Sequence, residues 1–196
     1  MSNKTIFRIA GISGILSALA MLVLSFAGDP NKGMSPVYAV PNAVLGIIFV
    51  AGLYVLYRSE ASTLSLAAAA ASVIGYLLFV VASLMQITFP SPLLAAADIA
   101  VYILGLTLFS WLAYRTHKMP RLLPLVGLLA ALSGVVTYIL MLGAGASAEN
   151  PSGVLGIFYF LYLILVVIWL VWTGISLQLK KSETMRTGIS MPTLQR

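Results

Sequence analysis

Residues 154–179, VLGIFYFLYLILVVIWLVWTGISLQL, decide the fold. The stretch carries no charge, and about 20 apolar residues are enough for a helix to cross a bilayer core. Aromatic residues stand near both of its ends, and Lys180 and Lys181 follow it directly. Tyr and Trp favour the two membrane interfaces, whereas Lys and Arg favour the cytoplasmic side. The stretch therefore predicts a membrane-spanning helix that ends in the cytoplasm.

Composition extends this interpretation to the whole chain. Of its 196 residues, 61% are hydrophobic and 8% are charged, and the mean hydropathy is +1.05. Soluble domains carry about 25% charged residues, so lipid must be the solvent for much of this surface. The net charge of +6 comes from basic residues at the ends of apolar segments, which favours anionic headgroups over nucleic acid as partners. The absence of cysteine excludes disulfides, thiolate metal sites and cysteine nucleophiles.

Apolar segments separated by turn-forming residues predict an all-α bundle of six membrane-spanning helices. We expect spans at residues 5–27, 37–57, 64–87, 94–114, 122–143 and 154–179, followed by a flexible basic cytoplasmic tail at 180–196. A cleaved signal peptide is the alternative for the first span, because a basic start, an apolar run and Ser25-Phe26-Ala27 suit a cleavage site. The length of the run favours a retained span.

Basic residues fall unevenly on the two sides of these spans. Of the 11 Lys and Arg residues, Lys32 alone lies in a predicted outer loop, and the others fall at inner span ends or in the termini. Cytoplasmic loops carry the excess of Lys and Arg in membrane proteins. We therefore expect a multi-pass protein of the cell (inner or cytoplasmic) membrane with both termini in the cytoplasm.

The spans pair into three similar helical hairpins. Odd-numbered spans carry small residues four positions apart, which are Ala10, Gly14 and Ala18, then Ala67, Ala71 and Gly75, then Ala130 and Gly134. Membrane helices approach one another through such small residues, so we expect the first two of these faces to be buried. Two explanations of the likeness stay open: three pseudo-repeated hairpins, or the general pattern of membrane helices.

Asp98 is the only acidic residue within a predicted span, and it falls in the first turn of span four. Ionisable groups at membrane depth are candidates for function. If Asp98 faces the interior, we expect at least one of four polar residues of the outer half within hydrogen-bonding distance: Asn42, Gln86, Tyr102 and Tyr138. Together they would form an outer-half polar pocket. The alternative is an outward-pointing cap at headgroup level, where the helix start favours a negative charge.

The inner surface predicts a basic collar that holds anionic lipid headgroups. Its members are Arg115, Lys118, Arg121, Lys180 and Lys181. His117, the only histidine, lies in the same inner loop, and a metal site needs several clustered ligands. The usual catalytic and nucleotide-binding motifs are absent from the sequence. We therefore expect no metal, no cofactor, no catalytic residues and no enzymatic activity.

The start FRIAGISGILSALAML at residues 7–22 and the hairpin layout resemble those of small, uncharacterised bacterial six-span membrane proteins, a family grouped as a domain of unknown function. The resemblance brings no catalytic or binding residue with it. We expect a non-enzymatic membrane component, namely a subunit, scaffold or lipid-associated factor. Its partners would be the bilayer, anionic lipid headgroups, and other proteins or copies of itself. The alternative is a carrier or pore for a small or lipophilic solute, with an outward-facing polar pocket around Asp98.

Overall fold

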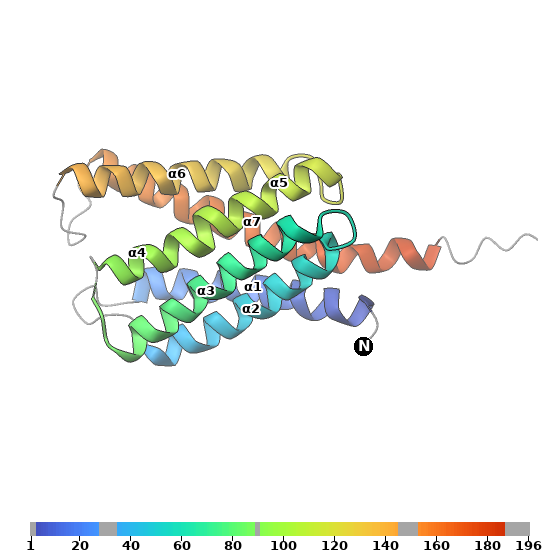
Figure 1. Ribbon diagram of the computed structural model, residues 1–196, viewed down its shortest axis with the longest axis horizontal. Helices are drawn as coiled ribbons and strands as arrows, with labels where there is room; N and C mark the ends of the chain where they lie inside the picture. Colours follow the sequence, from blue (N-terminus) through green and yellow to red (C-terminus); the bar gives the residue numbers. More distant parts are fainter. Residues whose placement is uncertain (1–2, 28–34, 89–90, 145–152, 187–196) are drawn as a thin grey trace, which may run out of the picture.

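The computed structural model describes residues 3–27, 35–88, 91–144 and 153–186, all in helices and short turns (Figure 1). The elements in order are α1 Asn3–Ala27, α2 Pro36–Tyr57, α3 Ser62–Leu84, α4 Pro92–Asp98, η1 Ile99–Gly105, α5 Leu106–Thr116, α6 Leu123–Ala144 and α7 Val154–Arg186. Within these residues six helical segments are long and apolar enough to cross a membrane, and α4, η1 and α5 together make one of them. The expected all-α, six-span class is confirmed, whereas the triplicated hairpin stays a prediction.

The six segments form a closed ring in the order of the sequence. Each segment packs against the next one along the chain, and α1 packs against α7 to close the ring (Figure 1). Large aromatic side chains fill the inside: the rings of Phe49 and Trp169 meet edge to face at 5.9 Å, and those of Tyr57 and Phe109 lie 6.4 Å apart. The core therefore lies along the axis of the ring, where all six segments contribute to it.

The ring has two chemically different ends. At the first, termed the Asp98 end, α1, α3 and α6 finish and α2, α4 and α7 begin. The second, termed the basic end, holds the Lys and Arg side chains that the structure describes, which are Lys4, Arg8, Arg58, Arg115, Lys118 and Arg121. Lys118 joins two loops there, because its Nζ lies 2.8 Å from Glu60 Oε1 and donates a hydrogen bond to the Leu56 carbonyl at 2.9 Å.

Glycines bring α1 and α7 together at backbone distance. A Cβ atom on Gly11 would lie 2.5 Å from the Gly174 carbonyl oxygen, and one on Gly174 would lie 2.6 Å from the Gly11 carbonyl oxygen. Ala10, Gly14 and Ala18 are all buried, as expected for this face of α1. The seam between α1 and α7 therefore has no room for a side chain at either glycine.

The small-residue stripe expected on α3 is only partly buried. Gly75 is buried, but Ala67 is exposed and Ala71 is half-buried, so the expected face is wrong at its first residue. Each step of four residues turns an α-helix about 40° past a full turn, so a strict spacing of four drifts off one face. The buried face instead runs through Ala68 and Ser72 to Gly75.

Two helix ends differ from the expected boundaries around Asp98. α3 ends at Leu84, and the next turn contains Gln86 with a left-handed φ of 51°. α4 begins at Pro92, because the preceding Ser91 caps it by accepting a hydrogen bond from the Leu93 N–H at 3.2 Å. Asp98 is therefore the seventh residue of its helix rather than a member of the first turn.

The last helix is longer than its apolar stretch. α7 continues past Leu179 to Arg186, so the first part of the tail expected to be flexible is helical. Residues 187–196, and the side chains of residues 180–186, lie outside what the structure describes.

Candidate functional site

Asp98 stands where span four changes its helical form. It is the last residue of α4, and the next seven residues, Ile99–Gly105, form the π-helix η1 before α5 continues. A π-helix bonds each residue to the fifth one along, and such segments in α-helices are frequent at functional sites. α3 packs closely here, since a Cβ atom on Gly105 would lie 2.1 Å from Ser72 Oγ. Within the span Pro92–Thr116, the change of form occurs in the first third, and η1 extends from there to the middle.

The Asp98 carboxyl points into the bundle and meets two tyrosines. The Tyr138 hydroxyl on α6 donates a hydrogen bond to Oδ2 at 2.5 Å, and the Tyr162 hydroxyl on α7 lies 3.4 Å from each carboxyl oxygen. Tyr138 is one of the four neighbours expected from the sequence, whereas Tyr162 was not among them. The carboxyl thus links α4 to two other helices instead of pointing toward headgroups.

A cavity of about 200 Å³, termed the Asp98 cavity, lies beside this carboxyl. Residues from five helices and from η1 line it: Met21, Ser25, Ala39, Asn42, Ala43, Tyr76, Phe79, Asp98, Tyr102 and Tyr159. Asn42, Asp98 and Tyr102 belong to the polar set expected from the sequence. The cavity therefore brings a carboxyl, an amide and three phenol rings to one space between the helices.

The amide of Asn42 belongs to a second polar group beside the cavity. Its Oδ1 accepts a hydrogen bond from Ser17 Oγ at 2.7 Å. The Tyr102 hydroxyl interacts with Asn42 and with the Tyr76 hydroxyl, and Tyr76 interacts in turn with Ser17. These contacts join α1, α2, α3 and η1, so the polar side chains around the cavity have protein partners on several helices.

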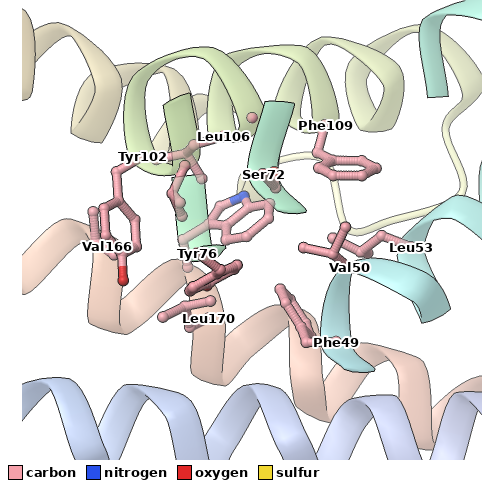
Figure 2. A pocket seen from close by; sticks show the side chains of 13 residues that line it. Phe49, Val50, Leu53, Ser72, Tyr76, Tyr102, Leu106, Phe109, Val166 and Leu170 are labelled. Carbon is pink, nitrogen blue, oxygen red and sulfur yellow. The ribbon is translucent and has the colours of Figure 1, made fainter. Parts of the chain in front are cut away.

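A second and smaller space, termed the central void, lies deeper in the bundle. Its volume is about 20 Å³, and Figure 2 shows side chains from α2, α3, η1, α5 and α7 converging on it. Tyr76 and Tyr102 line both the central void and the Asp98 cavity. Their rings meet edge to face at 6.5 Å. These two tyrosines therefore form the wall between the two spaces.

Gln86 was expected near Asp98, but the structure places it elsewhere. It is exposed in the turn after α3 and does not line the Asp98 cavity. The reason is that α3 ends two residues before Gln86, so the chain has already turned away from the helix axis. Its side chain is therefore not a member of the polar group around Asp98.

The expected lipid collar has members in different environments. Arg115 and Arg121 are exposed at the basic end, whereas Lys118 is half-buried and already binds Glu60 and the Leu56 carbonyl. The side chains of Lys180 and Lys181 lie outside the described residues. His117 is exposed and ends α5 with a left-handed φ of 53°. Lipid binding by the collar stays a prediction.

Sequence reasoning missed three tyrosines of the site: Tyr76, Tyr159 and Tyr162. Tyr159 and Tyr162 stand near the start of the last span, where aromatic residues are typical of the membrane interface. A better signal is spacing, since Tyr162 precedes the buried Val166 and Trp169 at steps of four and three. Residues at such steps share one helix face, so this pattern places Tyr162 inside the bundle.

No protein-family model, curated protein or solved structure matches this chain. The resemblance to the six-span bacterial family therefore stays a prediction, and the site is interpreted from its own geometry. A carboxyl, an amide and phenol hydroxyls can accept and donate hydrogen bonds to a small polar molecule. The aromatic faces beside them can contact its apolar part.

Proposed function

We propose that this multi-pass membrane protein binds a small solute in the Asp98 cavity and acts as a non-enzymatic carrier for it. One observation carries the proposal: the Asp98 carboxyl lines a cavity of about 200 Å³ between membrane-spanning helices. Ionisable side chains within spans are unfavourable in lipid and usually mark the pathway of a substrate or ion.

The change of helical form in the fourth span supports the same proposal. π-helical segments inside α-helices are frequent at functional sites. Here α4 changes to η1 directly after Asp98, within the apolar segment Pro92–Thr116. The carboxyl is therefore on the last residue of α4, directly before the one element of the span whose backbone departs from α-helical geometry.

The central void marks a route onward from the Asp98 cavity, but at about 20 Å³ it has room for about one water molecule and must widen for a solute to pass. It lies behind the wall formed by Tyr76 and Tyr102, and rotation of these two side chains would join it to the Asp98 cavity. With the basic end in the cytoplasm, as the charge asymmetry predicts, the Asp98 cavity serves the outer side of the membrane. Solute would then enter from outside and pass the tyrosine wall toward the cytoplasm.

The competing role is a packed membrane component that acts through protein partners. The close backbone seam between Gly11 and Gly174 favours it, because tight glycine contacts also occur in bundles with purely structural roles. The two roles differ in one measurable property. A carrier cavity admits water and solute, whereas a packed component keeps the same residues inaccessible.

Cysteine labelling separates the two roles, because the chain contains no natural cysteine. Ala39→Cys places a thiol on the Asp98 cavity, Ser72→Cys places one on the central void, and Ala68→Cys is the buried control that lines neither space. Each full-length variant is placed in lipid nanodiscs, treated with iodoacetamide, and analysed by intact mass spectrometry. Labelling after denaturation shows that each thiol is chemically competent.

We expect the Ala39→Cys variant to react at least about tenfold faster than the Ala68→Cys variant, since thiols in apolar surroundings stay protonated and unreactive. Reaction of Ser72→Cys at an intermediate rate would indicate that the tyrosine wall opens, as a carrier requires. Equal protection of Ala39→Cys and Ala68→Cys would overturn the proposal in favour of the packed component. If Ala39→Cys reacts but Ser72→Cys is protected, the protein binds a solute in the Asp98 cavity but does not carry it past the tyrosine wall.

A further inference from the structure

We infer that the solute of the Asp98 cavity is a small organic cation, of the ammonium or quaternary ammonium class. This inference rests on the proposed function, because it names the ligand of the same cavity. It begins with charge. The Lys and Arg side chains that the structure describes all lie at the basic end, and the ion pair it shows between Lys118 and Glu60 lies there too. Over the described ranges, the neighbours of Asp98 are phenol hydroxyls rather than cations.

Lining acceptors point to a positively charged ligand. Asp98 contributes a carboxyl, and Asn42 contributes an amide whose Oδ1 already serves as an acceptor for Ser17. An anion would be repelled by the carboxylate, and an apolar molecule would bring no opposite charge to it in a site of low dielectric. A cation gives the carboxylate the opposite charge that a group at membrane depth usually finds.

Aromatic rings on three elements complete a cage for such a cation. Tyr76 and Phe79 come from α3, Tyr102 comes from η1 and Tyr159 comes from α7. The faces of aromatic rings attract cations, and several rings around one ammonium group are the usual protein solution for quaternary ammonium ligands. The rings of Phe79 and Tyr102 lie 6.3 Å apart, which fixes one corner of this cage.

The size of the cavity limits the ligand. Sites for drug-sized molecules measure about 300–1,000 Å³, and the Asp98 cavity measures about 200 Å³. A compact ammonium ion with a few carbon atoms is therefore the fitting class, and choline is a suitable probe. Its neutral isostere 3,3-dimethyl-1-butanol has the same shape without the charge, so the pair isolates the contribution of charge.

Charged thiol reagents test the inference at the cavity itself. The Ala39→Cys variant in nanodiscs is treated with the cationic trimethylammonium-ethyl methanethiosulfonate or with its anionic sulfonate analogue. Rates are normalised to a free thiol in solution. The Ser35→Cys variant is the matched control, because Ser35 is exposed at the same end of α2 but does not line the cavity.

We expect the ratio of the cationic to the anionic labelling rate to be about tenfold or more higher at Ala39→Cys than at Ser35→Cys, because a focused negative charge attracts the cationic reagent. Adding Asp98→Asn should bring this preference down to the control value. Choline should slow labelling at lower concentration than 3,3-dimethyl-1-butanol does. The choline comparison needs only the native Asp98, so it holds even if Asp98→Asn fails to fold.

The outcomes distinguish the two proposals. If Ala39→Cys resists both charged reagents and iodoacetamide alike, the cavity is closed to water and the proposed function fails. If Ala39→Cys reacts with all three reagents without charge preference, and choline protects it no better than its neutral isostere, the cavity is open to solute as proposed but the cation inference fails. A preference for the anionic reagent would also overturn the inference.

Discussion

The two halves of the bundle differ in how their helices pack. In the half toward the Asp98 end, side-chain hydrogen bonds connect different helices, as between Tyr138 and Asp98 and between Ser17 and Asn42, and a cavity of about 200 Å³ remains. In the half toward the basic end, glycines bring backbones into contact and the central void measures about 20 Å³.

Buried polar atoms follow the same division. Among the described residues, three buried side-chain atoms are without a hydrogen-bond partner, namely Ser110 Oγ, Trp169 Nε1 and Thr173 Oγ1, and all three belong to the half toward the basic end. Lipid provides no hydrophobic driving force between helices, so close packing and interhelical hydrogen bonds must hold them together. The comparison indicates that packing stabilises the basic half, whereas polar contacts shape the Asp98 half for a ligand.

The largest effect should come from filling the α1–α7 seam. In Gly11→Leu the new Cβ would meet the Gly174 carbonyl oxygen at 2.5 Å, and backbone cannot move aside as a side chain can. Overpacking a core typically lowers the free energy of unfolding by about 1–3 kcal/mol, and we expect Gly11→Leu to lower it by at least that much. Thermal melting in detergent measures it, with Ile12→Leu on the exposed face of α1 as the control. Equal melting of the two variants would break the comparison.

A smaller loss is expected from Gly75→Leu beside the cavity. Its Cβ would first meet a side-chain atom, Val101 Cγ2 at 2.5 Å, and then the Ala97 carbonyl oxygen at 2.7 Å. The free energy of unfolding should fall by about 1–3 kcal/mol, because the Val101 side chain can adjust in part. Since α4 and η1 carry the strain, labelling of the Ala39→Cys variant should change as well. Unchanged melting and unchanged labelling together would contradict this account.

Removing a hydroxyl should have different results in the two halves. Ser17→Ala leaves the Asn42 Oδ1 acceptor without its donor, so we expect the free energy of unfolding to fall by about 1–3 kcal/mol. Ser110→Ala removes a buried hydroxyl without a partner in the described residues, so the melting temperature should stay the same or rise. The two substitutions are chemically identical, which makes each the control for the other. Equal losses would show that the halves do not differ in polar satisfaction.

The smallest effect is expected at the loop contact of the basic end. Lys118→Met removes the ion pair with Glu60 and the hydrogen bond to the Leu56 carbonyl. Half-exposed ion pairs contribute about 0–1 kcal/mol, and salt screens them. The difference from the parent protein should therefore shrink as salt is added during melting. Arg121→Met, at an exposed position of the same end, is the control.

The fold class could be predicted because it depends on quantities that a sequence contains directly. Apolar length fixed six spans to within a few residues, since a bilayer has a nearly constant thickness. The ends were less certain where a cap decides them, as Ser91 does for α4. The exposed Ala67 shows the same limit, because which face of α3 is buried depends on the neighbours it meets.

The candidate site could be predicted only in part. Asp98, Asn42 and Tyr102 were found from polarity at similar depth, and they do line one cavity. Gln86 was placed wrongly because depth alone does not give the rotation of a residue about the helix axis or the residue at which the helix ends. The π-helix left no sequence signal, since its residues are apolar and suit an ordinary membrane helix equally well.

That π-helix gives the site an unusual genetic sensitivity. One residue of an α-helix corresponds to about 100° of rotation. A π-helix takes more residues for each turn, because it bonds each residue to the fifth one along, so Ile99–Gly105 holds about one residue more than an α-helix of the same total rotation. If the same seven residues became α-helical, the Asp98 carboxyl would turn by about 100° relative to α5 and lose its position opposite Tyr138. The number of codons in this segment is therefore as important for the site as the identity of any residue in it.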